Sequence, residues 1–234
     1  MRRTMAKASL YTASNLLLFA VASTALLAWT YGLTRDTIAR SVENEKLKRI
    51  AQIVPITTYD NDIMKDTVSL AADKLLGYDE TAVAYLGYLN NQPSIAVLQA
   101  IAPDGYGGKI YLIIAVHRDG SISGVRVVSH QETPGLGDYI DIARSNWIAG
   151  FNGASLENRK AGEWKVKKDG GTFDYMAGAT ITPRAIVKAV HKALQYYTQH
   201  RDELFVAGPA SPSEEPAPGR FKREEQEAAE EKNK

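Results

Sequence analysis

The sequence contains no cysteine among its 234 residues. This absence excludes disulfides, zinc sites built on cysteine and iron–sulfur clusters held by cysteine. An excess of one charge is also missing, because 28 Lys and Arg are set against 27 Asp and Glu, and the basic residues are scattered. We therefore expect no nucleic-acid partner. The four histidines show no metal-ligand spacing, so we expect no metal site and interpret them as structural or surface residues: His117, His130, His191 and His200.

Only one stretch of the chain is long and apolar enough to cross a bilayer. No charged residue lies between Lys7 and Arg35, and a spanning helix needs about 20 mostly apolar residues. We predict a transmembrane helix over residues 10–33. Basic residues precede this run, so the positive-inside rule predicts that residues 1–9 are cytoplasmic and that the rest of the chain lies outside.

Two alternatives to an anchor remain for this stretch. Ala20-Val21-Ala22 resembles the small-residue cleavage site of a signal peptide, but the apolar run continues beyond it. A buried core helix is the other alternative, although no other part of the chain is apolar enough to surround such a helix.

The remaining sequence divides by composition. Residues 34–55 carry spaced Ile and Val and predict a stalk helix that ends near a proline. Residues 56–205 are enough for one core of ordinary domain size. Residues 206–234 are rich in proline and charge and poor in apolar residues, which predicts a disordered tail.

The middle of the chain predicts an α+β domain with an antiparallel sheet. Short apolar segments rich in Val, Ile and Tyr alternate with turn sequences, of which Asp119-Gly120 is the clearest hairpin signal. The predicted strands are 82–89, 94–101, 109–117 and 121–129.

Helical patterns flank these strands. Apolar residues at three- and four-residue steps predict a long final helix that starts at Thr182-Pro183 and fades near Arg201. We also predict helices over 67–76 and 140–149, and a second hairpin that joins 163–168 to 172–175.

The segment before the final helix is the candidate functional site. It reads Asp174-Tyr175-Met176-Ala177-Gly178-Ala179-Thr180 and places a hydroxyl on a small-residue turn. Unpaired amides and the dipole at a helix N-terminus favour an anion such as phosphate. The alternative is an ordinary turn in which Thr182 is the N-cap and Pro183 is the first helical residue.

Two other glycine-rich loops border the predicted sheet, at 105–109 and 130–138. Neither matches a P-loop or the dinucleotide-binding fingerprint. As isolated loops they are ordinary turns, but three small-residue loops in one domain indicate a ligand cleft. No pair of acids or Ser/His/Asp arrangement indicates hydrolysis, and Glu132 is a single carboxylate.

Together these segments resemble a known family. Glu132-Thr133-Pro134-Gly135-Leu136-Gly137 followed by Gly178-Ala179-Thr180 is similar to the FMN-binding domain of the G subunit of Rnf complexes, also called Rsx. The C subunit of the sodium-pumping NADH:quinone reductase is a relative. The resemblance extends over about residues 10–205.

The resemblance implies that FMN is attached covalently through a phosphoester to Thr180 by a separate flavin transferase, with Asp174 as part of the recognition sequence. Ala177 stands where the family has Ser or Thr. The phosphate would lie beside the amide of Thr182, and the 132–137 loop would flank the flavin ring. The implied cofactor-binding residues are Thr180, Glu132, Thr133, Pro134, Gly135, Leu136, Gly137, Ala177, Gly178, Ala179 and Thr182.

The resemblance also implies a role. It predicts a single-pass protein of the bacterial inner membrane with a periplasmic FMN domain, which relays electrons among other membrane subunits of an ion-translocating ferredoxin:NAD oxidoreductase. One span offers no ion pathway, so we expect that this chain alone cannot pump ions. The resemblance implies an electron-transfer subunit that is not catalytic alone. The alternatives are a scaffold subunit without redox function and a free-standing periplasmic FMN reductase.

Overall fold

The computed structural model describes residues 2–79 and 81–206, and within the first helix it describes side chains for residues 10–35 and 47–51. Contacts divide the chain into one unit that ends at Arg49 and a second that begins at Ile50. Each unit is described by itself. The predicted disordered tail, apart from Val206, lies outside the described residues.

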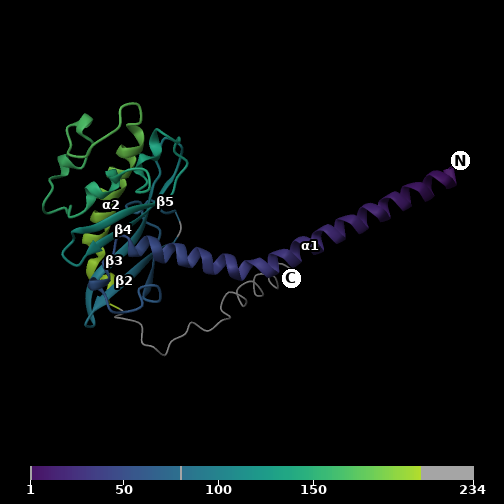
Figure 1. Ribbon diagram of the computed structural model, residues 1–234, viewed down its shortest axis with the longest axis horizontal. Helices are drawn as coiled ribbons and strands as arrows, with labels where there is room; N and C mark the ends of the chain where they lie inside the picture. Colours follow the sequence, from purple (N-terminus) through teal and green to yellow (C-terminus); the bar gives the residue numbers. More distant parts are fainter. Residues whose placement is uncertain (1, 80, 207–234) are drawn as a thin grey trace, which may run out of the picture. The chain divides into compact units, whose positions relative to one another are not determined.

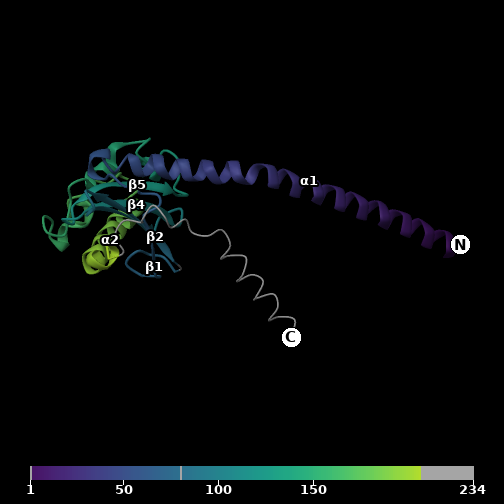
Figure 2. The ribbon, with the colours of Figure 1, turned by 90° about the horizontal axis from the view of Figure 1, so that it is seen from below.

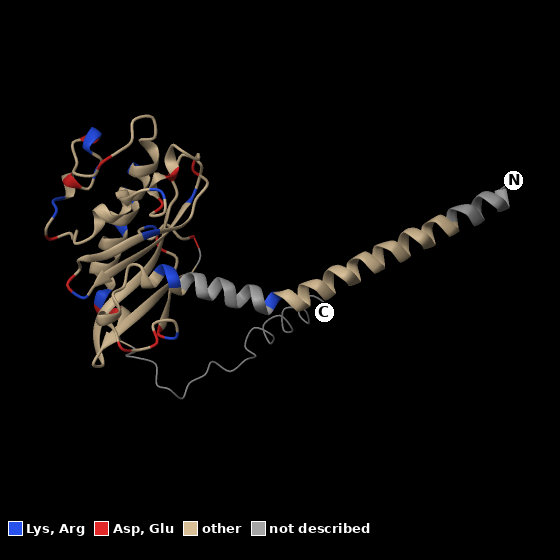
Figure 3. Cartoon of the chain, in the orientation of Figure 1, with Lys and Arg blue, Asp and Glu red and all other residues tan. Residues whose placement is uncertain are grey.

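Helix α1 (Arg2–Ala51) contains the apolar stretch. Its segment Leu10–Arg35 has a mean hydropathy of 1.8, and none of it is buried, so by length and composition it can cross a membrane. The hydroxyls of Thr30 and Thr34 bond to backbone carbonyls one turn earlier, which satisfies these polar groups inside a bilayer. Figure 3 shows no charged residue in this stretch except at its C-terminal end. The helix ends at Ala51, before Pro55.

The second unit is built on a five-stranded antiparallel sheet in the order β1-β2-β3-β4-β5 (Figure 1). The hairpin between β2 and β3 turns at Asn90 and Asn91, whose φ angles of 51° and 59° suit a two-residue primed turn. Gly120 (φ 87°) forms the predicted turn between β4 and β5. The strands are β1 (Thr67–Leu70), β2 (Ala82–Leu89), β3 (Gln92–Ala102), β4 (Ile110–His117) and β5 (Ile122–Ser129). The four predicted strands and the α+β class are confirmed.

Both faces of the sheet are apolar. Helix α2 (Ile181–Leu204) lies on one face (Figure 2), where Ile186, Val190, Leu194 and Tyr197 are almost fully buried. Each such side chain contributes roughly 1.5–3 kcal/mol of burial free energy. Residues of the other face, such as Val97 and Ile113, form a second cluster, in which Ile50, Ile53 and Val54 also take part.

The predicted helix over 67–76 is wrong. Thr67–Leu70 forms the edge strand β1, paired with β2 from Thr67↔Tyr85 to Leu70↔Ala82. Its β-branched residues and the burial of Leu70 suit a half-buried pleated edge better than a helix. A turn then leads to an isolated bridge between Asp73 and Tyr78.

The predicted helix over 140–149 is also wrong. Two 3-10 helices, η2 (Gly137–Ile140) and η3 (Asn146–Phe151), occupy this region. The side chain of Ser145 accepts a hydrogen bond from the amide of Trp147 and thereby caps the N-terminus of η3. A side-chain hydroxyl that bonds to the nearby backbone in this way competes with a continuous helix.

The hairpin predicted over 163–175 is wrong as well. Val166 and Phe173 form an isolated parallel bridge rather than an antiparallel ladder. The 3-10 helix η5 (Lys167–Asp169) and the left-handed Gly170 (φ 82°) turn the chain between them. The remaining short helices are η1 (Ile56–Thr58) and η4 (Ala161–Glu163).

Candidate functional site

Two of the glycine-rich loops and the start of α2 meet at the side chain of Glu132, which is only 5% exposed. Its Oε1 accepts a hydrogen bond from the amide of Gly107 at 3.1 Å. Its Oε2 accepts one from the hydroxyl of Thr182 at 2.6 Å. Charge-assisted bonds of this kind are about twice as strong as neutral ones. The carboxylate therefore joins the 105–108 loop, the 132–137 loop and α2.

The loops lie so close around Glu132 that glycine is required. A Cβ on Gly107 would lie 1.9 Å from the carbonyl oxygen of Gln131, and one on Gly137 would lie 2.6 Å from Oε2 of Glu132. Gly105 has the same constraint, with a Cβ 2.3 Å from the carbonyl oxygen of Gly108. These glycines serve close approach of the backbone rather than freedom of φ.

The N-terminus of α2 differs from the prediction. Thr180, not Thr182, is at the N-cap position, and its side chain makes no capping hydrogen bond. Thr182 lies inside the helix, is fully buried and bonds to Glu132. The predicted N-cap was wrong because a buried carboxylate from another loop takes the hydroxyl of Thr182. The predicted first helical residue, Pro183, is the third residue of the helix.

The hydroxyl of Thr180 is chemically free. The residue is half-buried, and within the described part of the chain its hydroxyl has no hydrogen-bond partner. The amides of Ile181 and Thr182 belong to the first turn and have no acceptor inside the helix. A nucleophile-capable oxygen and unpaired N–H groups thus lie together at the positive end of a 24-residue helix.

A tight turn presents Thr180. The amide of Ala179 donates to the carbonyl of Met176 at 3.1 Å, and Gly178 has a φ of 88° at the position where a type II turn requires a positive value. Ala177 and Gly178 are exposed, and no heavy atom lies within 4 Å of a Cβ built on Gly178. The turn therefore leaves open space beside Thr180.

Two contacts hold the base of this turn. The indole Nε1 of Trp147 donates to the carbonyl of Asp174 at 2.8 Å. The carboxylate of Asp174 pairs with Nζ of Lys167 at 2.5 Å, and both side chains are mostly exposed. Lys167 was not predicted from the sequence, because the incorrect hairpin hid the bridge that brings it to Asp174. The Trp147 contact was not predicted either, since it joins residues 27 positions apart.

Aromatic residues support Trp147 from behind. Its ring makes edge contacts with Tyr139 and Phe151, each at 5.6 Å between centroids. Tyr139 is buried, and burial raises the pKa of its hydroxyl to about 12. The hydroxyl approaches the backbone of Met176 in the turn, but it forms no hydrogen bond of standard geometry in the described residues. The turn thus rests on a packed aromatic base.

Several apolar side chains near the turn remain exposed to solvent. The predicted site residues Thr133, Pro134, Gly135 and Leu136 are all exposed, and Leu136 is 47% exposed. In the turn and at the start of α2, the exposed fractions are 40% for Tyr175, 39% for Met176 and 47% for Ile181. These side chains offer apolar surface to a planar ring.

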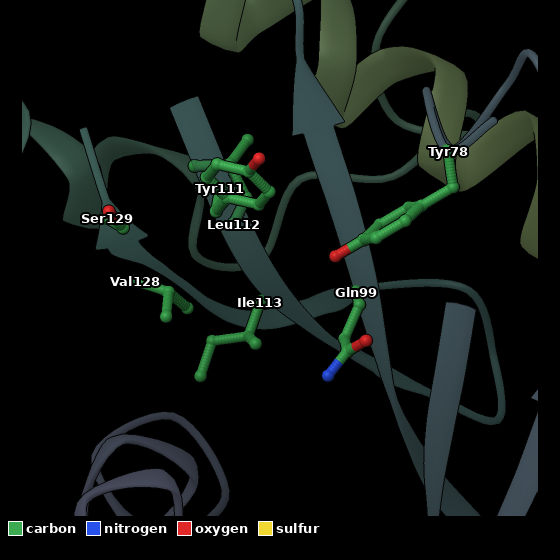
Figure 4. Close-up of a pocket in the computed structure, with 7 residues that line it drawn as sticks. All are labelled: Tyr78, Gln99, Tyr111, Leu112, Ile113, Val128 and Ser129. Atoms are coloured by element: carbon green, nitrogen blue, oxygen red, sulfur yellow. The ribbon is translucent and has the colours of Figure 1, made fainter. Parts of the chain in front are cut away.

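A separate hollow of about 300 Å³ lies on the sheet (Figure 4). Tyr78, Gln99, Tyr111 and Ile113 are among its lining residues, and burial raises the pKa of Tyr78. None of the predicted site residues lines it. The candidate site is therefore the open turn at α2 rather than this hollow.

The residues at the turn fit a phosphorylated flavin. Unpaired helix amides suit a phosphate, small residues leave space beside it, and exposed apolar side chains suit an isoalloxazine ring. The fold and this site define an FMN-binding domain, and the family model for the FMN-binding domain matches residues 105–195.

Comparison with known proteins defines the family more closely. The model of the RnfG N-terminal region matches residues 1–53. The chain is 48% identical over 204 residues to the G subunit of an ion-translocating oxidoreductase complex of Aliivibrio fischeri, covering 87% of this chain and 95% of that protein. Two proteins with the same description are each 46% identical to this chain. The one from Vibrio cholerae matches over 81% of this chain and 90% of its own length. The one from Pseudomonas aeruginosa matches over 80% of this chain and 87% of its own length. The chain belongs to the family of G subunits of ion-translocating oxidoreductase complexes, so it is a flavoprotein subunit of an Rnf-type complex. The apolar helix together with this family indicates membrane anchoring.

Proposed function

We propose that FMN is attached covalently to this protein through a phosphoester with Oγ of Thr180. The observation that carries the proposal is the half-buried, unpartnered hydroxyl beside unpaired amides at the start of α2. Oγ attacks the phosphorus of an FMN phosphoanhydride held by a flavin transferase. The Oγ–P bond forms, the anhydride P–O bond breaks, and the other half of the anhydride leaves as a phosphate monoester. The hydroxyl proton passes to a base of the transferase. No oxidation or reduction occurs in this step.

Different residues around Thr180 would bind different parts of the cofactor. The amides of Ile181 and Thr182 bind the phosphate, and Ala177, Gly178 and Ala179 leave it room. Leu136 provides an apolar face for the ring, which is free for one- or two-electron transfer when it is bound through its phosphate. Direct contact between Glu132 and FMN remains a prediction, because both oxygens of that carboxylate already bond to the protein.

Asp174 is the proposed recognition residue for the transferase. It is exposed, and its backbone is fixed by Trp147. Ala177, which replaces a hydroxyl residue of the family sequence, is exposed as well. A side chain at that position would face solvent, so its replacement by Ala leaves the acceptor at Thr180 unaffected.

The proposed role is electron relay. We infer that the chain spans the bacterial inner membrane once, with residues 1–9 cytoplasmic and the FMN domain periplasmic, as the positive-inside rule favours. Other membrane subunits pass electrons to and from its flavin within a ferredoxin:NAD oxidoreductase that moves ions. The chain is an electron-transfer subunit and does not catalyse the overall reaction alone. Covalent attachment would retain the flavin outside the cytoplasm, where a dissociated cofactor would be lost.

Flavin fluorescence on a denaturing gel tests this proposal. Protein made together with the transferase should give a fluorescent band of the chain's size, and Thr180→Ala should abolish it. Thr180→Ser should restore label, because it keeps the attacking oxygen. Label retained by Thr180→Ala would show that the attachment residue is wrong, and a wild-type protein without label would favour the scaffold alternative. Purification without other hydrophobic subunits would favour a free-standing reductase.

A further inference from the structure

A basic hollow of about 430 Å³ lies beside the attachment turn, between α2 and the 164–169 segment. Its floor is apolar and includes Trp164, which is only 4% exposed. The indole stacks on the ring of His191 with 5.2 Å between centroids and an interplanar angle of 7°. The stacked rings and the buried Val166 and Val187 give the hollow an apolar floor, and the half-buried His191 is the ring of the stack that solvent reaches.

The rim of the hollow is positively charged. Arg184 forms two hydrogen bonds to Asp169, at 2.5 and 2.6 Å, which lower the pKa of that carboxyl. Lys188 pairs with Asp104 at 2.5 Å. In contrast, Lys165 and Lys168 are exposed and form no ion pair with any carboxylate in the described residues. Both lysines nevertheless lie close enough to Asp169 to help lower its pKa, and Lys165 lines the hollow. Three basic side chains, Lys165, Lys168 and Arg184, therefore surround one carboxylate, which leaves this surface positively charged.

The hollow lies within reach of whatever docks at Thr180. Arg184 on its rim follows Thr180 by four residues, or about 6 Å along the helix. A standard protein interface covers about 800 Å² of each partner, which corresponds to a radius of about 16 Å. An interface of that size centred on Thr180 would therefore extend over this hollow.

We propose that this basic hollow is the docking surface for the flavin-donating enzyme, which presents an acidic and apolar segment to it. Acidic side chains of that enzyme pair with Lys165 and Lys168, and an apolar side chain enters the hollow and packs against His191. The inference rests on the proposed attachment at Thr180. Rim charges act chiefly on the association rate and its dependence on salt.

The test measures the initial rate of flavin labelling of the full-length chain in detergent, with purified transferase at low ionic strength. The double variant Lys165→Glu/Lys168→Glu should label at least about 10-fold more slowly than the wild type. The rates should converge as salt is raised, and the final extent of label should be equal. The neutral variant Lys165→Gln/Lys168→Gln should lie between the two.

A matched control carries the same change of charge elsewhere. Lys65→Glu/Lys74→Glu alters two exposed lysines that flank β1, at the opposite edge of the sheet from β5. It should label within about twofold of the wild type, because a Debye length of about 10 Å at 0.1 M salt screens distant charges. Thermal midpoints should show that all variants are folded.

Labelling of Lys165→Glu/Lys168→Glu at the wild-type rate at low salt would overturn the docking proposal. If this variant labels at the wild-type rate but no longer purifies with the other subunits, the hollow contacts a neighbouring subunit instead. That result would also overturn the docking proposal. Label retained on Thr180→Ala would contradict the attachment proposal, and this variant leaves the charges of the hollow intact, so the two failures are distinguishable.

Discussion

Two threonines at the start of α2 lie two residues apart and have opposite environments. Thr180 is half-buried, and its hydroxyl is free in the described structure. Thr182 is fully buried, and its hydroxyl bonds to Glu132 at 2.6 Å. The second threonine ties the helix to two glycine loops, so the first can present a reactive oxygen on a rigid base. This combination suits the proposed attachment at Thr180, because a rigid base lowers the entropy lost when a ligand is bound beside it.

The rigid base should be most sensitive at Gly107. In Gly107→Ala the new Cβ would lie 1.9 Å from the carbonyl oxygen of Gln131, so backbone must move and the bond to Glu132 weakens. We expect a loss of about 3 kcal/mol or more in the free energy of unfolding. Denaturant unfolding of the wild type and the variant measures it. Gly150→Ala is the matched control, since a Cβ there meets nothing within 4 Å; an equal loss in both would refute the packing explanation.

Removing the hydrogen bond between Thr182 and Glu132 should cause the next largest loss of stability. Thr182→Val keeps the shape of the side chain and leaves one oxygen of the buried Glu132 without its donor. We expect a loss of about 2 kcal/mol in the free energy of unfolding. Thr180→Val, the matched change two residues away, should cost less than about 0.5 kcal/mol because no bond is lost. Similar losses in both variants would remove the contrast between the two threonines.

Trp147 tests the support of the turn. Trp147→Phe keeps an aromatic ring against Tyr139 and Phe151 and removes the hydrogen bond to the carbonyl of Asp174. We expect a loss of about 1 kcal/mol in stability. Hydrogen exchange should become faster at the amide of Ala179, which closes the turn. Exchange in β3 should change only as much as the lower free energy of global unfolding requires. Unchanged exchange at Ala179 would show that the indole does not hold the turn.

The smallest effect at neutral pH is expected for Tyr139. Its pKa of about 12 exceeds the value of about 10 in the unfolded chain, so its contribution to stability is present below pH 10 and is lost as pH rises through 12. Tyr139→Phe removes a buried hydroxyl whose approach to the backbone of Met176 falls short of a standard hydrogen bond, so the change should be close to neutral at pH 7.

Above pH 10 the wild type should lose on the order of 2 kcal/mol more than Tyr139→Phe. Thermal midpoints measured from pH 7 to pH 11.5 check this. Tyr106→Phe is the control, because Tyr106 is 69% exposed. Parallel pH profiles for Tyr139→Phe and the wild type would show that Tyr139 is not the group that titrates.

Local patterns were sufficient for the central sheet. Strands β2 to β5 could be predicted because apolar residues and turn residues alternate over short distances, and the Asp119-Gly120 turn joins neighbours in sequence. Strand β1 could not, since Thr67–Leu70 becomes a strand only by pairing with β2. The 3-10 helices around 137–151 likewise depend on contacts such as Ser145 with Tyr139, which no periodicity shows.

The candidate site divides in the same way. The apolar segment, the absence of cysteine, the position of Thr180 before a helix and the similarity to an FMN-binding family could all be read from the amino-acid sequence, because each depends on residue identity and order along the chain. The folded chain was needed to show that Glu132 bonds to Thr182, 50 residues away, and that Lys167 and Trp147 hold Asp174. A hydroxyl is free or bonded according to what the rest of the chain brings to it, and that depends on contacts between distant segments.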